Sequence, residues 1–573
     1  MNPADTATDD AGRQYQKLFE EFTRRLGRTA TADDGDFFRG MIDALVADPG
    51  RWADIQQRHY TAHLELWHSF FDADGKPAGD STAADRRFGA PDWHTTPYFD
   101  YLHQAYLLNI RWLSELVEQA VLAPRDKTRL RFLTGRFADA MSPANFPFTN
   151  PEALRLAFET GGASIAQGLR NFAADLAQGR ISTNDETAFR IGRNLAVTPG
   201  AVIFENELMQ LIQYRPLTDT VFERPLLIVP PCINKFYILD LRPDNSFVRH
   251  ALAHGHTVFM ISWRNIPPAL GHLTWDDYVE RGVLRAIDAA GDICGVTQVN
   301  TLGFCIGGTL LATALAVSHE RHPQASLTLL ATMTDFRDGG ELGAFVDEAW
   351  VTNCEQQFRD GGIFRGEQLA LAFASLRAND LVWRYVVNNY LKGLKPAAFD
   401  LLYWNSDSAD LPGPMFAYYL RNMYLENNLR VPGKLTTCGV PVDLSRLAIP
   451  VYAVAASDDH IVPWRSAYAS ARLLPGAVRF VLAASGHVAG IINPAGGARR
   501  SYRTAPDGLP ENPDSWFAAS ASQPGSWWTD WSAWSAAHGG RRVAARSTLG
   551  NARHPEIEPA PGRYVTENHP RQP

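Results

Sequence analysis

The chain has 573 residues, of which 45% are hydrophobic and 20% charged, and its formal net charge at pH 7 is −8. A chain of this size buries a large core and is expected to form two domains or one domain with large insertions. The acidic balance and the lack of a basic block argue against nucleic acid or an anionic membrane as the main partner.

The first residues, Met1 to Asp10, have neither the basic nor the apolar region of a signal peptide. No stretch approaches the ~18 unbroken apolar residues of a membrane span, so we expect a cytoplasmic protein without a transmembrane segment. The five cysteines are odd in number and show no CxxC or Cys/His ligand spacing. They therefore predict neither a disulfide framework nor a metal site.

Residues 1–190 are predicted to form a helical N-terminal domain, because apolar residues recur there at three- and four-residue spacing and strand patterns are missing. The clearest predicted helices are Tyr15–Phe22, Phe37–Leu45, His59–Phe71 and Tyr98–Leu122. Aromatic residues are dense on these helices, which fits a helical core and also fits an exposed docking surface.

Residues 191–573 are predicted to form a catalytic domain in which short apolar runs alternate with helices. The predicted strands are Pro225–Pro230, Thr257–Ser262, Val299–Leu302, Ser326–Ala331, Val451–Ala455 and Val478–Leu482. Such runs are typical of central strands in a mostly parallel sheet that helices cover on both faces.

The alternation lapses at about residues 332–447, where helical and aromatic segments take its place. Phe399–Trp404 is too apolar for a solvated loop. We interpret the insertion as a lid over the sheet, with Trp404 as the candidate contact between two subunits; a rigid cap is the alternative.

The most informative motif is Gly303–Gly308, which follows the strand at Val299 and opens a helix-like segment. It has the Gly-x-nucleophile-x-Gly pattern of a sharp strand-to-helix turn, with Cys305 as the nucleophile. A helix N-terminus beneath the sulfur favours thiolate, and the amide of Ile306 is placed to bind an oxyanion. Together with the predicted sheet, this turn indicates an α/β-hydrolase fold.

On this fold the nucleophile is followed along the chain by an acid and then a histidine, each on a loop after a later strand. His487, in Ser485-Gly486-His487, is the candidate base. The candidate acids are Asp459, its neighbour Asp458, and Asp335, which also follows a predicted strand. A backbone amide near Cys232 or Ile233 is the candidate second oxyanion donor, although that segment also reads as a plain proline-rich turn.

These segments closely resemble the polyhydroxyalkanoate synthases of class I, the poly(3-hydroxybutyrate) type. The resemblance runs from Asp85–Gly89 to Gly550–Arg563. Its strongest blocks are Val202–Glu207, Val229–Lys235, Ser262–Asn265, Gly303–Thr309, Asp459–Trp464 and Ser485–His487. The family's aspartate directly precedes His-Ile-Val-Pro, so the resemblance selects Asp459.

The resemblance implies an acyltransferase that polymerises (R)-3-hydroxyacyl-CoA, above all 3-hydroxybutyryl-CoA, and releases CoA through an acyl-enzyme on Cys305. It implies a homodimer on the surface of cytoplasmic polyester granules, with phasin-type proteins as partners. No separate cofactor is expected, since the substrate carries the CoA. The alternatives are a cytosolic thioesterase or hydrolase with the same three residues and a granule-coating interaction protein.

Overall fold

The computed structural model describes residues 49–71, 85–496, 500–506 and 508–567. Its internal contacts divide the chain into two compact units, Met1–Glu152 and Ala153–Pro573. The predicted helices Tyr15–Phe22 and Phe37–Leu45 lie outside the described residues. Among the described helices, none is long and apolar enough to cross a membrane.

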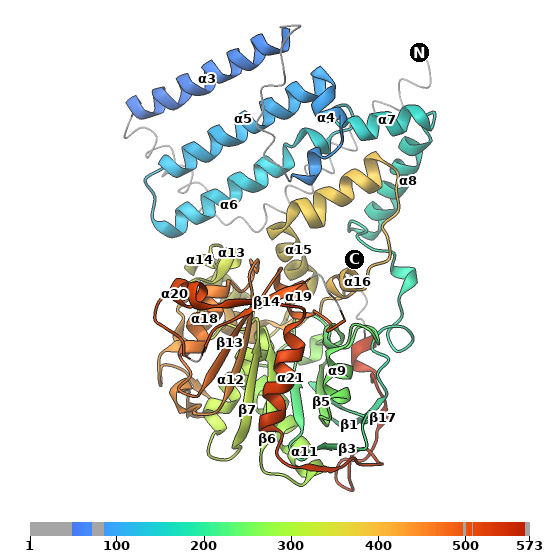
Figure 1. Cartoon of the computed structure of the whole chain (residues 1–573), viewed down its shortest axis with the longest axis vertical. Helices are drawn as coiled ribbons and strands as arrows, with labels where there is room; N and C mark the ends of the chain where they lie inside the picture. The colour runs from blue at the N-terminus through green and yellow to red at the C-terminus, as the bar shows by residue number, and fades with distance from the viewer. Residues whose placement is uncertain (1–48, 72–84, 497–499, 507, 568–573) are drawn as a thin grey trace. The chain divides into compact units, whose positions relative to one another are not determined.

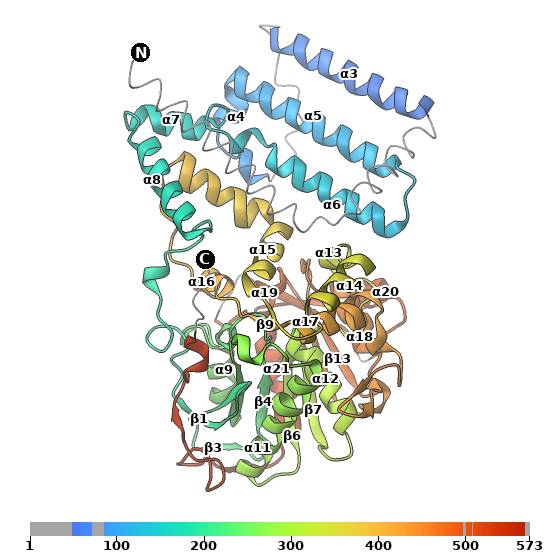
Figure 2. The same cartoon turned by 180° about the vertical axis from the view of Figure 1, so that it is seen from behind.

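The described part of the first unit is helical throughout, as predicted. Its α-helices are α3 (Pro49–Phe71), α4 (Asp92–Thr95), α5 (Pro97–Gln119) and α6 (Pro124–Ala140), and its 3-10 helices are η1 (Arg86–Phe88) and η2 (Pro143–Asn145). Figures 1 and 2 show α3, α5 and α6 side by side. Phe88, Trp93 and Tyr106 form a small buried core, whereas Trp67 of α3 is 48% exposed. The aromatic residues thus supply both a core and an exposed face.

The second unit begins with helices. α7 (Pro151–Glu159), whose first two residues belong to the first unit, leads into α8 (Ala163–Gln178). α8 packs on the π-helix η8 (Val386–Leu391). Asn171 donates to the carbonyl of Asn389 at 2.9 Å, and the Tyr390 hydroxyl donates to Asp175 at 2.7 Å. The predicted boundary near residue 190 marks where strands begin, but these contacts place α8 with the residues that follow it.

An eleven-stranded sheet forms the centre of the second unit, in the order β15-β14-β13-β12-β7-β6-β4-β5-β2-β1-β17. The six parallel strands are β4 (Leu226–Val229), β5 (Val258–Trp263), β6 (Val299–Phe304), β7 (Gln324–Leu330), β12 (Val451–Ala456) and β13 (Val478–Ala483). All six predicted strands are confirmed. Antiparallel strands flank them: β1 (Gly200–Glu205), β2 (Met209–Tyr214) and β17 (Glu558–Pro559) at one edge, and β14 (Ser501–Thr504) and β15 (Ala521–Pro524) at the other.

Helices cover both faces of this sheet, so alternate strand residues enter two separate cores. In β4, Leu227 and Val229 belong to one core, whereas Leu226 and Ile228 belong to the other. Figure 1 shows α9 (Phe247–Ala253) and α21 (Trp527–His538) before the sheet, and Figure 2 shows α11 (Arg285–Cys294) and α12 (Ile306–Ser318) on the opposite side. The predicted doubly covered sheet is confirmed.

The insertion between β7 and β12 is helical, as predicted. Its main helices are α13 (Gly340–Gly343), α14 (Glu348–Gln357), α15 (Gly366–Leu376), η7 (Asn379–Trp383), η8, α16 (Asp400–Ser406), α17 (Gly413–Tyr419) and η9 (Leu420–Leu425). The expectation that Trp404 contacts a second subunit is wrong. Its side chain is 5% exposed, and its indole nitrogen donates to the carbonyl of Lys235 at 2.7 Å inside the same chain.

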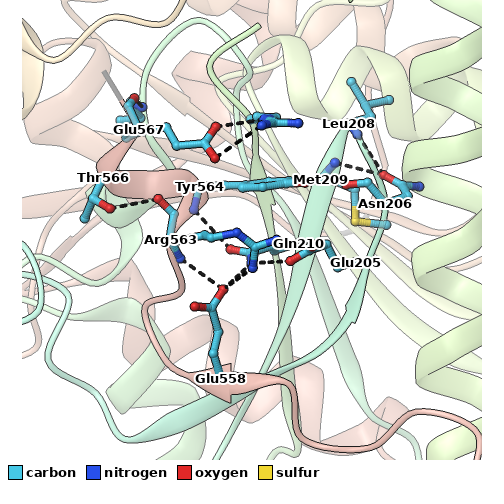
Figure 3. Close-up of polar contacts among 12 residues, drawn as sticks. Glu205, Asn206, Leu208, Met209, Gln210, Glu558, Arg563, Tyr564, Thr566 and Glu567 are labelled. Carbon is cyan, nitrogen blue, oxygen red and sulfur yellow. Dashed lines mark hydrogen bonds and ion pairs between the residues drawn. The ribbon is translucent and has the colours of Figure 1, made fainter. Parts of the chain in front are cut away.

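The C-terminal segment is fastened to the first strands of the sheet through the buried side chain of Gln210 (Figure 3). The Gln210 amide donates to Glu205 at 2.7 Å and also to Glu558, and its oxygen accepts from the amide of Tyr564 at 3.2 Å. Further along, the Arg264 guanidinium binds the Glu567 carboxylate at 2.7 Å. The segment therefore reaches from the sheet edge to the loops at the ends of β4 and β5.

We predict that Gln210→Ala destabilises the second unit, because it removes the buried acceptor of the Tyr564 amide, whereas the carboxylates of Glu205 and Glu558 keep Arg563 as a partner. Each buried polar group left unpaired costs about 1–3 kcal/mol. The denaturant midpoint should fall, and limited proteolysis should cut within residues 550–567. The matched control is Gln368→Ala at an exposed site on α15, which should change neither; equal effects of the two substitutions would contradict the prediction.

Candidate active site

Cys305 lies on a strained corner between β6 and α12, with φ 53° and ψ −127°. The glycines around it permit this corner. A Cβ on Gly303 would lie 2.4 Å from the Cα of Gly308, and one on Gly307 would lie 2.4 Å from the carbonyl oxygen of Val229. The predicted turn is therefore present, and Cys305 is partly exposed while the adjoining strand and helix are buried.

His487 is positioned by Asp459, as the sequence and the resemblance predict. The Nδ1 of His487, the first residue of α19 (His487–Ile491), lies 2.7 Å from Oδ2 of Asp459. The other carboxylate oxygen, Oδ1, accepts the amides of Ile461 at 2.9 Å and Val462 at 2.8 Å. Both oxygens of this buried carboxylate are thus committed, which fixes the histidine ring.

His487 also forms a hydrogen bond with the side chain of Cys305 and stacks on Phe304 at 5.6 Å. Burial by itself lowers the pKa of His487, but the charge of Asp459, the electrostatic influence of Cys305 and the hydrogen bonds to both side chains raise it well above the ordinary 6.5. The structure therefore joins the three predicted residues into one chain of contacts, and this environment favours the charged form of the imidazole over the neutral one.

The two other candidate acids, Asp458 and Asp335, form hydrogen bonds elsewhere. Asp458 lies on the exposed side of the same loop, where it accepts from Ser457 at 3.1 Å. Asp335 is buried away from the histidine and accepts from Asn427 at 2.8 Å and from the backbone amide of Arg337 at 3.1 Å. Neither contact involves His487, so geometry leaves Asp459 as the partner.

The remaining four thiols are unsuited to nucleophilic attack. Burial raises the pKa of Cys354 to about 11 and of Cys294 and Cys438 to about 12. Cys232 is the most buried of the four, and its pKa is raised by burial and, to a smaller extent, by the electrostatic influence of Cys305. These thiols stay protonated at neutral pH, and a thiol is a far weaker nucleophile than a thiolate.

The amide of Ile306 is the first of α12 and has no acceptor within the helix. The loop that holds the second candidate donor is tied to the insertion. The carbonyl of Ile233 accepts from the amide of Ala409 at 2.7 Å, and the carbonyl of Lys235 accepts from the indole of Trp404. The Lys235 ammonium in turn donates to the carbonyl of Glu567 at 3.1 Å. Insertion and C-terminal segment thus fix this loop together.

The sequence did not predict that two tyrosines lie near the thiol of Cys305. Tyr419 and Tyr424 are buried and hydrogen-bonded to each other, and the electrostatic influence of Cys305 reaches both. Burial raises the pKa of each hydroxyl. Phe336 packs edge-on against Tyr424 at 5.1 Å. The aromatic run in the insertion was visible in the sequence, but nothing in its spacing pointed toward Cys305.

Comparisons with known proteins agree with this geometry. A family model described as "Poly-beta-hydroxybutyrate polymerase (PhaC) N-terminus" matches residues 84–251, and an alpha/beta hydrolase fold model matches residues 225–494. The poly(3-hydroxyalkanoate) polymerase subunit PhaC of Cupriavidus necator is 52% identical over 534 residues, which cover 91% of this chain and 90% of that protein. The chain belongs to the poly(3-hydroxyalkanoate) polymerase family.

Another member of the poly(3-hydroxyalkanoate) polymerase family, from Methylorubrum extorquens, is 40% identical over 97% of this chain and 91% of its own length. The subunit PhaC of Rhizobium etli is 37% identical over 96% of this chain and 91% of its own length. The family resemblance found in the sequence is therefore confirmed, as is the α/β-hydrolase fold.

The raised pKa of His487 predicts a pH-dependent contribution to stability. Because the folded pKa lies above the unfolded value of 6.5, the contribution is fully present below pH 6.5 and is lost as the pH rises through the folded pKa. Asp459→Asn removes the main cause of the raised pKa. The difference in denaturant midpoint between the unsubstituted chain and this variant, measured from pH 6 upward, should shrink with rising pH. Asp458→Asn should show no such trend; a difference for Asp459→Asn that stays constant would contradict the assignment.

Proposed function

We propose that this enzyme polymerises (R)-3-hydroxyacyl-CoA, above all 3-hydroxybutyryl-CoA, into polyhydroxyalkanoate and releases CoA, with Cys305, His487 and Asp459 as the catalytic residues. The observation that carries the proposal is the line of contacts from Asp459 through His487 to Cys305, on a strained turn in a chain of this family. The names of the relatives support polyhydroxyalkanoate as the product. The contacts among the three residues support an acyl-enzyme on Cys305 as the intermediate.

In the first half-reaction the Cys305 thiolate attacks the thioester carbonyl. The negative oxygen of the tetrahedral intermediate accepts from the Ile306 amide, which is free for this role at the helix start. CoA leaves as its C–S bond breaks and takes the proton of the His487 imidazolium. An acyl-thioester on Cys305 remains. A thiol nucleophile suits this step, because it exchanges one thioester for another at nearly equal energy.

In the second half-reaction neutral His487 takes the proton of a 3-hydroxyl group, whose oxygen attacks the acyl carbon on Cys305. An ester bond forms, the C–S bond breaks and the Cys305 thiolate returns beside the imidazolium. Asp459 holds the ring in the tautomer that exposes Nε2 and stabilises its positive charge. The first half-reaction uses the proton of the His487 imidazolium, and the second restores it, so the charged form that the raised pKa favours is the form at the start of each cycle.

Water competes with the hydroxyl for the acyl-enzyme, so a polymerase has to exclude it. Tyr419, Tyr424 and Phe336, all buried, supply an aromatic environment beside the thiol. This surrounding favours the polymerase over the alternative of a thioesterase or hydrolase, in which water is the second substrate. We propose that the insertion at about residues 332–447 opens as a lid to admit substrate.

We extend the proposal to the assembly. The chain is expected to act as a homodimer on cytoplasmic polyester granules, beside phasin-type proteins, with no cofactor other than the CoA that the substrate brings. Since Trp404 is internal, the contact between subunits has to use other residues. Sedimentation of the purified chain across a dilution series tests the dimer.

The central test is incubation with (R)-3-hydroxybutyryl-CoA. We expect polymer together with CoA release, whereas free hydroxy acid would favour the hydrolase and no CoA release the coat protein. Cys305→Ala should abolish CoA release, and mass spectrometry of the unsubstituted chain should find the acyl adduct on Cys305. Cys354→Ala and Cys438→Ala are the matched controls and should retain activity. An adduct on Cys232 or Cys294 would overturn the nucleophile.

A second test compares the two adjacent aspartates. Asp459→Asn should slow CoA release on the order of 10⁴-fold, because the asparagine misorients the histidine and cannot stabilise its charge. Asp458→Asn changes the neighbouring residue in the same way and should stay close to the unsubstituted rate. Equal losses, or the reverse order, would reject Asp459 as the acid.

A further inference from the structure

A second group of chemistry-bearing side chains lies in the first unit and takes no part in the proposed reaction. His94 is on the short helix α4, and Asp100 and His103 are one turn apart on α5. One possible ligand atom from each residue can be chosen so that all three lie within 4.8 Å of one another. The group combines two imidazoles with one carboxylate, a set that binds divalent transition metals.

His103 is the buried member of the group. Its side chain is 8% exposed, and its Nδ1 has no hydrogen-bond partner among the described residues. A buried polar nitrogen without a partner is costly, and such atoms call for an explanation in a native structure. The ring is held in place by Phe88, on which it stacks at 4.3 Å.

His94 is oriented in the way that metal-binding histidines commonly are. Its Nε2 lies 3.1 Å from the backbone carbonyl of Phe88. Since a carbonyl only accepts, Nε2 carries the proton and Nδ1 keeps its lone pair. Ligating histidines usually donate their other ring N–H to a carbonyl or carboxylate, which fixes the tautomer and the ring.

The backbone beneath the group is well anchored. α4 is held by Trp93, whose side chain is fully buried, and α5 begins with Pro97 at its first position, where the fixed φ suits a helix start. Asp100 follows in the first turn of α5 and His103 one turn later. The three side chains therefore project from neighbouring rigid segments.

We propose that His94, Asp100 and His103 bind one zinc ion, which clamps α4 onto α5. Zinc bonds of about 2.0–2.1 Å place tetrahedral ligand atoms about 3.3 Å apart, so side-chain rotations close the remaining gap from 4.8 Å. His94 is exposed, which leaves the fourth position open to water. The sequence prediction about metal sites relied on cysteine spacing, and it could not find this site because none of its three residues is a cysteine.

The test is zinc binding by the untagged full-length chain carrying Cys305→Ala, which removes the partly exposed thiol of the active site as a competing ligand. Calorimetric titration with Zn²⁺ should show one tight site. His94→Gln and Asp100→Asn should each weaken it at least about 100-fold, since loss of an outer-shell partner alone costs about 10- to 100-fold. His94 is exposed and Asp100→Asn is isosteric, so both variants should fold.

His68→Gln is the matched control, because it removes an exposed histidine of α3 outside the group and should leave the affinity unchanged. Co²⁺ in place of Zn²⁺ should give the visible spectrum of nitrogen and oxygen ligands without a thiolate charge-transfer band. The proposal is overturned if no stoichiometric zinc binds, if His94→Gln and Asp100→Asn bind it as tightly as the reference chain, or if a thiolate band appears.

Discussion

The close approach of three backbone segments around Cys305 is the constraint on which the rest of the site depends. A left-handed φ at a non-glycine residue is strained, and it persists only where the surroundings enforce it. Here β6, α12 and the end of β4 meet so closely that Gly303 and Gly307 have no room for a Cβ. That crowding fixes the partly exposed Cys305 at a helix start, while burial raises the pKa of the other four thiols.

Asp459 and His487 are held in place because both oxygens of the carboxylate have hydrogen-bond partners. Asp459 uses one oxygen for two backbone amides and the other for His487, so its carboxylate cannot turn away from the ring. Burial would lower the pKa of His487, but the electrostatic influence of Asp459 and Cys305 and the hydrogen bonds to them outweigh it. The raised pKa of His487 therefore depends mainly on Asp459, and Cys305 adds to it.

Segments far apart in the sequence stabilise the loop that follows β4. Trp404 of the insertion and Glu567 near the C-terminus both bind Lys235, and Ala409 binds the carbonyl of Ile233. The loop beside the thiol thus depends on contacts with residues more than a hundred positions away. Changes in the insertion or the C-terminal segment can therefore reach the site through this loop without touching the three catalytic candidates.

The sequence by itself determined the central strands, the turn at Cys305 and the choice of His487 as a residue that could meet it. Strands buried on both faces are apolar at every position, and a Gly-x-Cys-x-Gly turn is a local pattern. It did not reveal β2, because the buried residues Gln210 and Gln213 interrupt its apolar run. Those amides are tolerated only because residues 550–564 supply their partners.

Only the tertiary structure showed that Asp459, and not Asp458, contacts His487. It also showed that Trp404 is buried and that α8 belongs to the second unit. It also gathered His94, Asp100 and His103. Each of these outcomes depends on contacts that form only when the chain folds, and the spacing of residues in the sequence does not predict those contacts.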